Sequence, residues 1–153
     1  MNFLLRIEDM KLRRLFLVFL AFISWPLFVS AGDGLKPSED KTKEAMQKVI
    51  SSQLEAFRAD NYDAAYIFAD LAIRRLYPVQ MFERMVKRGY PMIAHSVSAS
   101  FGLSLDNGDE ATVNVRITGP DNQIETYQYQ LRLEGVNWRI MGVVPLKDQT
   151  TEV

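Results

Sequence analysis

The alternation of apolar and polar residues between Val97 and Val144 constrains the fold of this chain more than any other feature. Four runs in this stretch repeat with a period of two, which is typical of strands that bury one face. Such a face must be covered by other elements, so the residues upstream are predicted to pack on it. The residues predicted on the buried face are Val97, Ala99, Phe101, Leu103 and Leu105; Ala111, Val113, Val115 and Ile117; Tyr127, Tyr129, Leu131 and Leu133; and Trp138, Ile140 and Val144.

Short loops connect these four runs. The first contains Asn107 and Gly108, the second Gly119 and Pro120, and the third Gly135, all residue types that favour tight turns. Loops this short make consecutive strands antiparallel neighbours. The stretch therefore predicts a four-stranded antiparallel meander.

Three helices are predicted before the strands. Apolar residues at spacings of three and four indicate one helix over Lys43–Ala59, and a second helix starts at Tyr62. Pro78 suits the first position of a third helix, which Gly89 ends. The segment Leu71–Tyr77 either extends the second helix or forms a turn. The predicted fold class is α+β, with three N-terminal helices packed on a curved, cone-like meander in one domain at residues 43–146.

The N-terminus predicts a signal peptide at residues 1–31. Basic residues precede the apolar run Leu15–Val29, and Ala31 completes a small-residue cleavage pattern. The run is shorter than the ~20 residues of a membrane-spanning helix, which favours cleavage. Cleavage predicts a periplasmic or secreted protein with a flexible spacer at residues 32–42 and a frayed tail at 147–153. The alternative is that this segment is not cleaved and anchors the protein in the membrane, which is the only membrane contact predicted. The start of the chain is either Met1 or Met10.

The composition excludes several kinds of site. The chain has no cysteine, which excludes disulfides, thiolate metal ligands and cysteine nucleophiles. Its formal net charge of -1 provides no global attraction for nucleic acid. Because His95 is the only histidine, no metal site is predicted. Motifs for binding phosphates or dinucleotides are absent, so no cofactor is predicted.

Four tyrosines and the histidine are the candidate ligand-binding residues. Tyrosine rings give a cavity apolar walls with polar tips, which suit a small apolar ligand. The alternative is that the rings pack in the core and only their hydroxyls reach the surface. The candidates are Tyr66, Tyr90, His95, Tyr127 and Tyr129.

Asp70 and His95 are the candidate residues for acid–base chemistry. A histidine titrates near neutral pH, and a carboxylate becomes a general base when burial raises its pKa. Neither residue is assigned to catalysis, because recognising a catalytic pair requires geometry that the sequence does not contain.

Basic residues dominate the region from Arg74 to Arg88. They form either a solvated helix face with local ion pairs, such as Glu83–Lys87 and Asp70–Arg74, or a surface for an anionic partner. The basic residues are Arg74, Arg75, Arg84, Lys87 and Arg88.

Four segments, Val49–Ala59, Asp63–Leu76, Phe82–Pro91 and Asn137–Val144, resemble a family of small exported bacterial proteins, the domain-of-unknown-function family 4864. The order of elements also resembles the broader nuclear transport factor 2-like and SnoaL-like cone folds. This resemblance implies a cone with an open mouth. Relatives of the broad fold include isomerases, dehydratases and domains that bind or dimerise. The family itself implies no assigned activity and no catalytic residue.

The favoured hypothesis is an exported, non-enzymatic module that binds a small apolar ligand or a partner. One alternative is a cone-fold lyase or isomerase that uses Asp70 or His95. Another is a homodimer whose sheets pack face to face without a ligand. Met141 and Val143 favour the homodimer, because alternation places them on the face opposite Ile140.

Overall fold

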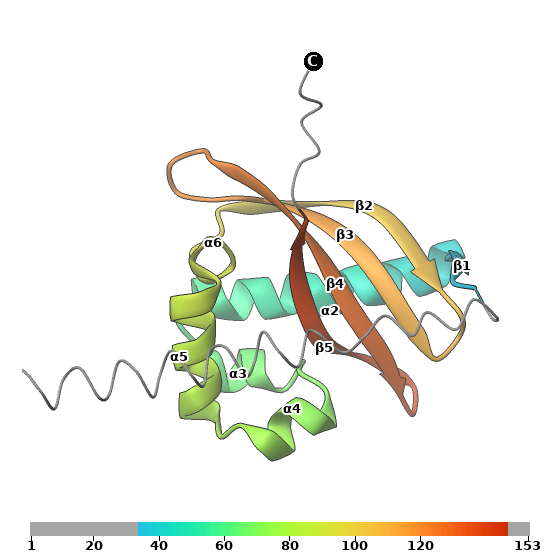
Figure 1. The fold of residues 1–153 in the computed structure, drawn as a ribbon, viewed down its shortest axis with the longest axis horizontal. Coiled ribbons are helices and arrows are strands. Elements are labelled where there is room, and N and C mark those ends of the chain that lie inside the picture. Colours follow the sequence, from blue (N-terminus) through green and yellow to red (C-terminus); the bar gives the residue numbers. More distant parts are fainter. Residues whose placement is uncertain (1–33, 147–153) are drawn as a thin grey trace, which may run out of the picture. The chain divides into compact units, whose positions relative to one another are not determined.

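An antiparallel sheet of five strands forms the centre of the computed structural model, which describes residues 34–146 (Figure 1). The strands lie side by side in chain order. The predicted signal peptide and the predicted tail lie outside the described residues. The strands are β1 (Lys36–Pro37), β2 (Ser98–Asp106), β3 (Glu110–Thr118), β4 (Ile124–Glu134) and β5 (Asn137–Leu146).

Helix α2 runs across one face of the sheet, and three shorter helices gather near its C-terminal end (Figure 1). It buries one stripe of side chains at helical spacing, namely Met46, Ile50, Gln53, Leu54 and Phe57. This agrees with the apolar stripe predicted from the sequence. The helices in the described part of the chain are α2 (Asp40–Arg58), α3 (Tyr62–Tyr66), α4 (Leu71–Leu76), α5 (Val79–Gly89) and α6 (Pro91–Ala94).

The α+β class and the antiparallel sheet are confirmed, but the predicted three helices and four strands are too few for residues 34–146. Asp70 separates α3 from α4, because its backbone N–H donates to the Ile140 carbonyl at 2.9 Å. The Ile140 N–H in turn donates to the Phe68 carbonyl at 2.9 Å. This short connection therefore pairs with the free edge of β5 instead of continuing the helix.

The additional strand and the additional helix have local causes. Lys36–Pro37, which the sequence places in a spacer, pairs with the end of β2 as strand β1. Helix α2 also begins within that spacer, at Asp40. Pro91 begins α6 at a position where its missing N–H removes no helical hydrogen bond.

Strands β3 and β4 bury the residues that alternation predicts. Their side chains interleave with the stripe of α2 and with the aromatic residues of α3 and α5 to form a single core. The same holds for the start of β5, where Trp138 and Ile140 are buried. The confirmed residues of β3 and β4 are Ala111, Val113, Val115, Ile117, Tyr127, Tyr129 and Leu131, with Leu133 partly buried against them.

A β-bulge in β2 overturns part of the prediction for that strand. The register with β3 shifts between Phe101 and Ser104, so two residues of β2 oppose one residue of β3. Ser104 is therefore buried on the core side, whereas Leu103 is 58% exposed. The prediction is confirmed for Ala99 and Phe101, which pack against the core, and is wrong for Val97, Leu103 and Leu105.

A second bulge overturns the prediction for the end of β5. Met141 has no partner in the register with β4. After it, Val143 pairs with Tyr129 and packs against the core, whereas Val144 pairs with Gln128 on the outer face. The sequence predicted the opposite orientation for both valines. Val143 is consequently absent from the outer face through which a face-to-face dimer would form.

Candidate functional site

Three of the candidate ligand-binding residues, Tyr90, Tyr127 and Tyr129, lie together on the core side of β4. The Tyr90 hydroxyl donates to the Val143 carbonyl at 3.2 Å, and the Tyr127 hydroxyl donates to the Glu125 carboxylate. Burial raises the pKa of the Tyr90 hydroxyl. Burial is also the largest cause of the raised pKa of the Tyr129 hydroxyl, and the nearby Tyr127 and Tyr90 raise it further. These three hydroxyls therefore remain protonated at neutral pH.

The Tyr129 side chain is completely enclosed, and its hydroxyl has no hydrogen-bond partner within residues 34–146. Its neighbours on the core face, Val113 and Leu131, have no accessible surface either. A side chain without accessible surface borders no space large enough for a water molecule. A small ligand beside Tyr129 would therefore require the surrounding side chains to move.

The substitution Tyr129→Phe is expected to raise the free energy of unfolding by about 1–2 kcal/mol, because the hydroxyl gives up water on folding without gaining a hydrogen bond. Urea unfolding of the two proteins measures the difference. The matched control is Tyr127→Phe, which removes a hydroxyl that is bonded to Glu125, and no stabilisation is expected from it.

Alkaline pH provides a second measurement on the same variant. Because the folded-state pKa of Tyr129 lies above its ordinary value, the unfolded chain loses this proton first as the pH rises. The parent chain therefore loses additional stability above about pH 10, where the unfolded tyrosine ionises. Tyr129→Phe should therefore lose less stability between about pH 9 and 11 than the parent chain. A Tyr129→Phe protein less stable than its parent at neutral pH would contradict this account.

Tyr66 and His95 have different surroundings from these three tyrosines. The Tyr66 hydroxyl lies 2.7 Å from the Arg74 carbonyl and 2.5 Å from the Tyr77 carbonyl, so it holds the C-terminal half of α4. His95 follows α6 as its C-cap and is exposed. The five candidate ligand-binding residues therefore do not line one site.

Asp70 is 3% exposed and acts as the N-cap of α4. One carboxylate oxygen accepts the Ile73 N–H at 2.8 Å, and the other lies 3.9 Å from a guanidinium nitrogen of Arg132. His95 lies beyond the far end of α5, which is 11 residues or roughly 16 Å long. The structure thus places Asp70 in a helix cap and an ion pair, and it does not bring Asp70 and His95 to a common point.

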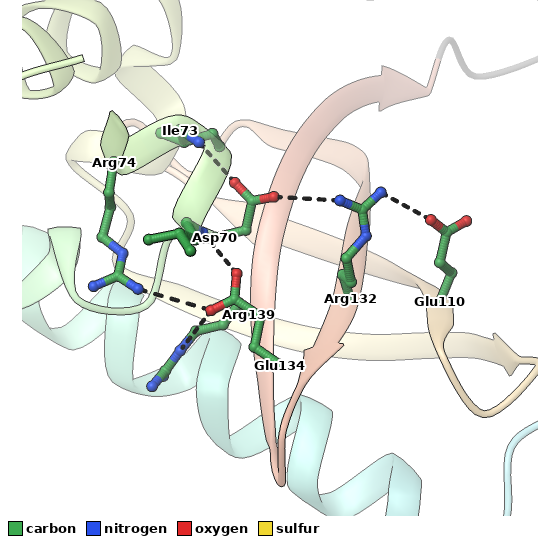
Figure 2. A network of polar contacts seen from close by, with 8 residues as sticks. Asp70, Ile73, Arg74, Glu110, Arg132, Glu134 and Arg139 are labelled. Atoms are coloured by element: carbon green, nitrogen blue, oxygen red, sulfur yellow. Dashed lines mark hydrogen bonds and ion pairs between the residues drawn. The ribbon is translucent and has the colours of Figure 1, made fainter. Parts of the chain in front are cut away.

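Charged side chains continue from Asp70 across the outer face of β3, β4 and β5 (Figure 2). Arg132 also bonds Glu110 at 2.9 Å. Glu134 accepts the Leu71 N–H at 2.6 Å, and its other oxygen lies 3.7 Å from Arg74 and 3.9 Å from Arg139. Asp70 and Glu134 therefore both attach the first turn of α4 to the sheet, and we call this pair of attachments the α4 latch.

Helix α4 contributes no fully buried residue. Its exposed positions are apolar or basic, and Ile67, just before the helix, is also exposed. We define the α4 surface as Ile67, Leu71, Ala72, Arg75 and Leu76. This surface was not predicted from the sequence. The available signal was that Leu71 and Leu76 fall outside the apolar stripe of the preceding predicted helix.

The basic region divides into paired and unpaired residues. Lys87 lies 2.8 Å from Glu83 and 2.9 Å from Asp60. The bond to Asp60 is the larger cause, and the bond to Glu83 the second, of the raised pKa of the Lys87 ammonium group. This confirms the predicted Glu83–Lys87 pair. The predicted Asp70–Arg74 pair is wrong, because Asp70 turns toward Arg132 and Arg74 toward Glu134. The exposed residues of this region that form no ion pair within residues 34–146 are Arg75, Arg84 and Arg88.

The described part of the chain contains no group of three or more His, Asp or Glu side chains that could hold a metal ion. None of the helices described in residues 34–146 is long and apolar enough to cross a membrane. The described residues form a small α+β domain whose distinctive surface feature is a peripheral helix, α4, held by polar contacts.

Comparison with known proteins places this domain in a family. Residues 39–153 match the model of the family described as "Domain of unknown function (DUF4864)". The chain belongs to this family, which confirms the resemblance seen in the sequence. The family description assigns no activity, and no curated protein matches the chain.

One similar solved structure is the solution structure of RPA3114, a SEC-C motif containing protein from Rhodopseudomonas palustris. It is 14% identical, with 64% of this chain and 76% of that chain covered and a TM-score of 0.48. The expected likeness to the nuclear transport factor 2-like and SnoaL-like cones stays a prediction, because the comparisons confirm the domain-of-unknown-function family alone.

Proposed function

We propose that this domain is an exported, non-enzymatic interaction module that binds a protein partner through the α4 surface. The observation that supports the proposal is that α4 directs Leu71 and Leu76 away from the core, while the α4 latch holds the helix in place. Export is proposed from the N-terminal leader.

The energetics of α4 favour a role outside the core. Burying a leucine side chain stabilises a folded protein by about 1.5–3 kcal/mol, and Leu76, at 64% exposed, gains little of this in the free domain. Without a partner, this short helix is held by polar contacts with Asp70, Glu134 and Tyr66 and by one partly buried apolar residue, Ile73. A partner that covers the α4 surface would recover the missing apolar burial.

The charges around α4 define the chemistry of that partner. The helix has no acidic residue, and its exposed Arg75 forms no ion pair within residues 34–146. The complementary surface is therefore a protein segment that presents apolar side chains flanked by carboxylates. An anionic membrane is disfavoured, because helices that lie in the membrane interface are commonly far longer than six residues. The enclosed interior around Tyr129 disfavours a small ligand inside the domain.

A crosslinking experiment followed by a binding measurement tests the proposal. A photocrosslinking residue at Leu76 of the full chain, produced in its own cells, is expected to capture a protein that the same probe at Val136 does not. Val136 is the matched control, because it is also an exposed apolar residue, 89% exposed, in the turn between β4 and β5.

The captured protein, once purified, is expected to bind the parent chain and to lose at least about tenfold in affinity toward Leu71→Ser with Leu76→Ser. Arg75→Glu should also weaken binding, whereas Val136→Ser should not. Equal binding by all variants would contradict the proposal. Binding only to phosphatidylglycerol vesicles, with no captured protein, would replace the protein partner with an anionic membrane.

A further inference from the structure

Strand β2 has a free edge between Val97 and Leu103. Strand β1 pairs only with the last two residues of β2, and the Ser38 N–H donates to the Ser104 carbonyl at 3.0 Å. No other strand within residues 34–146 lies on this side of β2. At the other end, the Arg58 side chain bonds the Ser96 carbonyl at 2.9 Å. The unpaired edge is therefore limited at both ends.

The free edge carries neither a charged residue nor a proline, which are two of the features that commonly prevent strand pairing, and its β-bulge lies at its last residues, Gly102 and Leu103. Protective edges carry charged residues or proline, because an unpaired strand offers its N–H and C=O groups to any extended chain. This edge reads Val-Ser-Ala-Ser-Phe-Gly-Leu from residue 97 to residue 103, with no charge and no proline. Val97, at 61% exposed, and Leu103 add apolar side chains at its two ends.

We propose that a second copy of this chain pairs with the free edge of β2 in antiparallel orientation, with the two-fold axis at Ser100. Two five-stranded sheets would then form one continuous sheet. In this register Ser100 lies opposite the partner's Ser100, and Ala99 lies opposite the partner's Phe101. The axis is at the midpoint of the regular part of the free edge, so the pairing runs from Ser98 to Gly102 and ends at the bulge before Leu103.

The side chains on both faces of β2 fit this register. Ala99 and Phe101 point to the core side, opposite Ile117 and Val115, but both are only partly buried because no strand lies beyond them. In the paired register each Phe101 lies beside the partner's Ala99, with Cβ atoms about 4.5–5.5 Å apart. Pairing in this register therefore continues the apolar face of one sheet into the apolar face of the other.

The outer face imposes no steric barrier. Ser98 lies opposite the partner's Gly102, and the two Ser100 side chains meet at the axis, so these cross-strand pairs are small. Leu103, which the bulge leaves exposed, lies beyond the paired segment. A two-fold pairing requires an edge that is complementary to itself. The β2 edge meets this requirement in the register given above, and we therefore infer a second copy and not an unrelated strand. The inference goes beyond the proposed function, since the α4 surface does not include β2.

Charge substitution at the axis tests the dimer, because Ser100 meets only itself. Sedimentation velocity of the protein purified after expression of the complete chain is expected to show twice the monomer mass. Ser100→Lys and Ser100→Glu should each weaken self-association several-fold, since like charges directly opposite one another destabilise paired strands. An equimolar mixture of the two variants should restore the dimer, because it places Lys opposite Glu.

Thr126→Lys is the matched control for this experiment. Thr126 and Ser100 flank Arg116 on the same outer face, so each new lysine has the same basic neighbour. Only Ser100 lies on the free edge, and Thr126→Lys should therefore leave the dimer intact. A monomeric parent chain at all concentrations, a dimer that Ser100→Lys leaves unchanged, or a mixture that does not reassociate would each overturn the inference.

Discussion

Replacing Leu131 with alanine is expected to lower the free energy of unfolding by about 2–5 kcal/mol. Leu131 has no accessible surface and lies in β4 between Ala111 of β3 and Ile140 of β5. Hydrogen-bonded strands on both sides hold the backbone in place, so the structure cannot collapse into the space that the removed atoms leave. Urea unfolding monitored by circular dichroism measures the change.

Leu103→Ala is the control for this prediction, and its expected effect is within about 0.5 kcal/mol. The two leucines have the same position in the alternating pattern, and a reading of the sequence alone predicts the same cost for both. The structure distinguishes them, because the bulge in β2 leaves Leu103 exposed. Similar losses of stability from the two substitutions would contradict the register of β2.

The success of the strand predictions depended on regular pairing. In β3 and β4 the register runs without interruption through nine residue pairs, from Glu110–Arg132 to Thr118–Ile124, and the alternation identifies every buried residue. In β2 and β5 one extra residue reverses the two faces part of the way along the strand. Gly102 and Gly142 lie at these irregularities, and an isolated glycine in a strand pattern was the available sign of a bulge.

The polar features of the site were harder to predict because their partners are distant in sequence. Asp70 was singled out as a candidate base, although an aspartate before an apolar segment is also typical of a helix N-cap. That local signal was sufficient to predict α4, although the prediction for this segment was either an extension of the second helix or a turn. The contacts of Asp70 with Arg132 and of Leu71 with Glu134 cross more than sixty positions of the chain, and no local pattern indicates them.

Glu134→Ala is expected to destabilise the protein by about 1–3 kcal/mol and to release α4 locally. The carboxylate accepts the Leu71 N–H at 2.6 Å and is the anion nearest to Arg74 and Arg139. The Nε atoms of both arginines are buried without a hydrogen bond in the described part of the chain, so they depend on this charge. Amide hydrogen exchange should show protection falling in α4 more than in β3, and urea unfolding gives the global change.

Two further variants separate the parts of this effect. Glu110→Ala removes an exposed carboxylate that pairs with Arg132 at 2.9 Å but bonds no helix N–H, so its expected cost is about 0–1 kcal/mol. Glu134→Gln keeps a neutral acceptor for the Leu71 N–H and loses the charge, so its effect should lie between those of the two alanine variants. If α4 kept its exchange protection in Glu134→Ala, the latch could not be what holds the helix, and the core contact of Ile73 would have to explain its order.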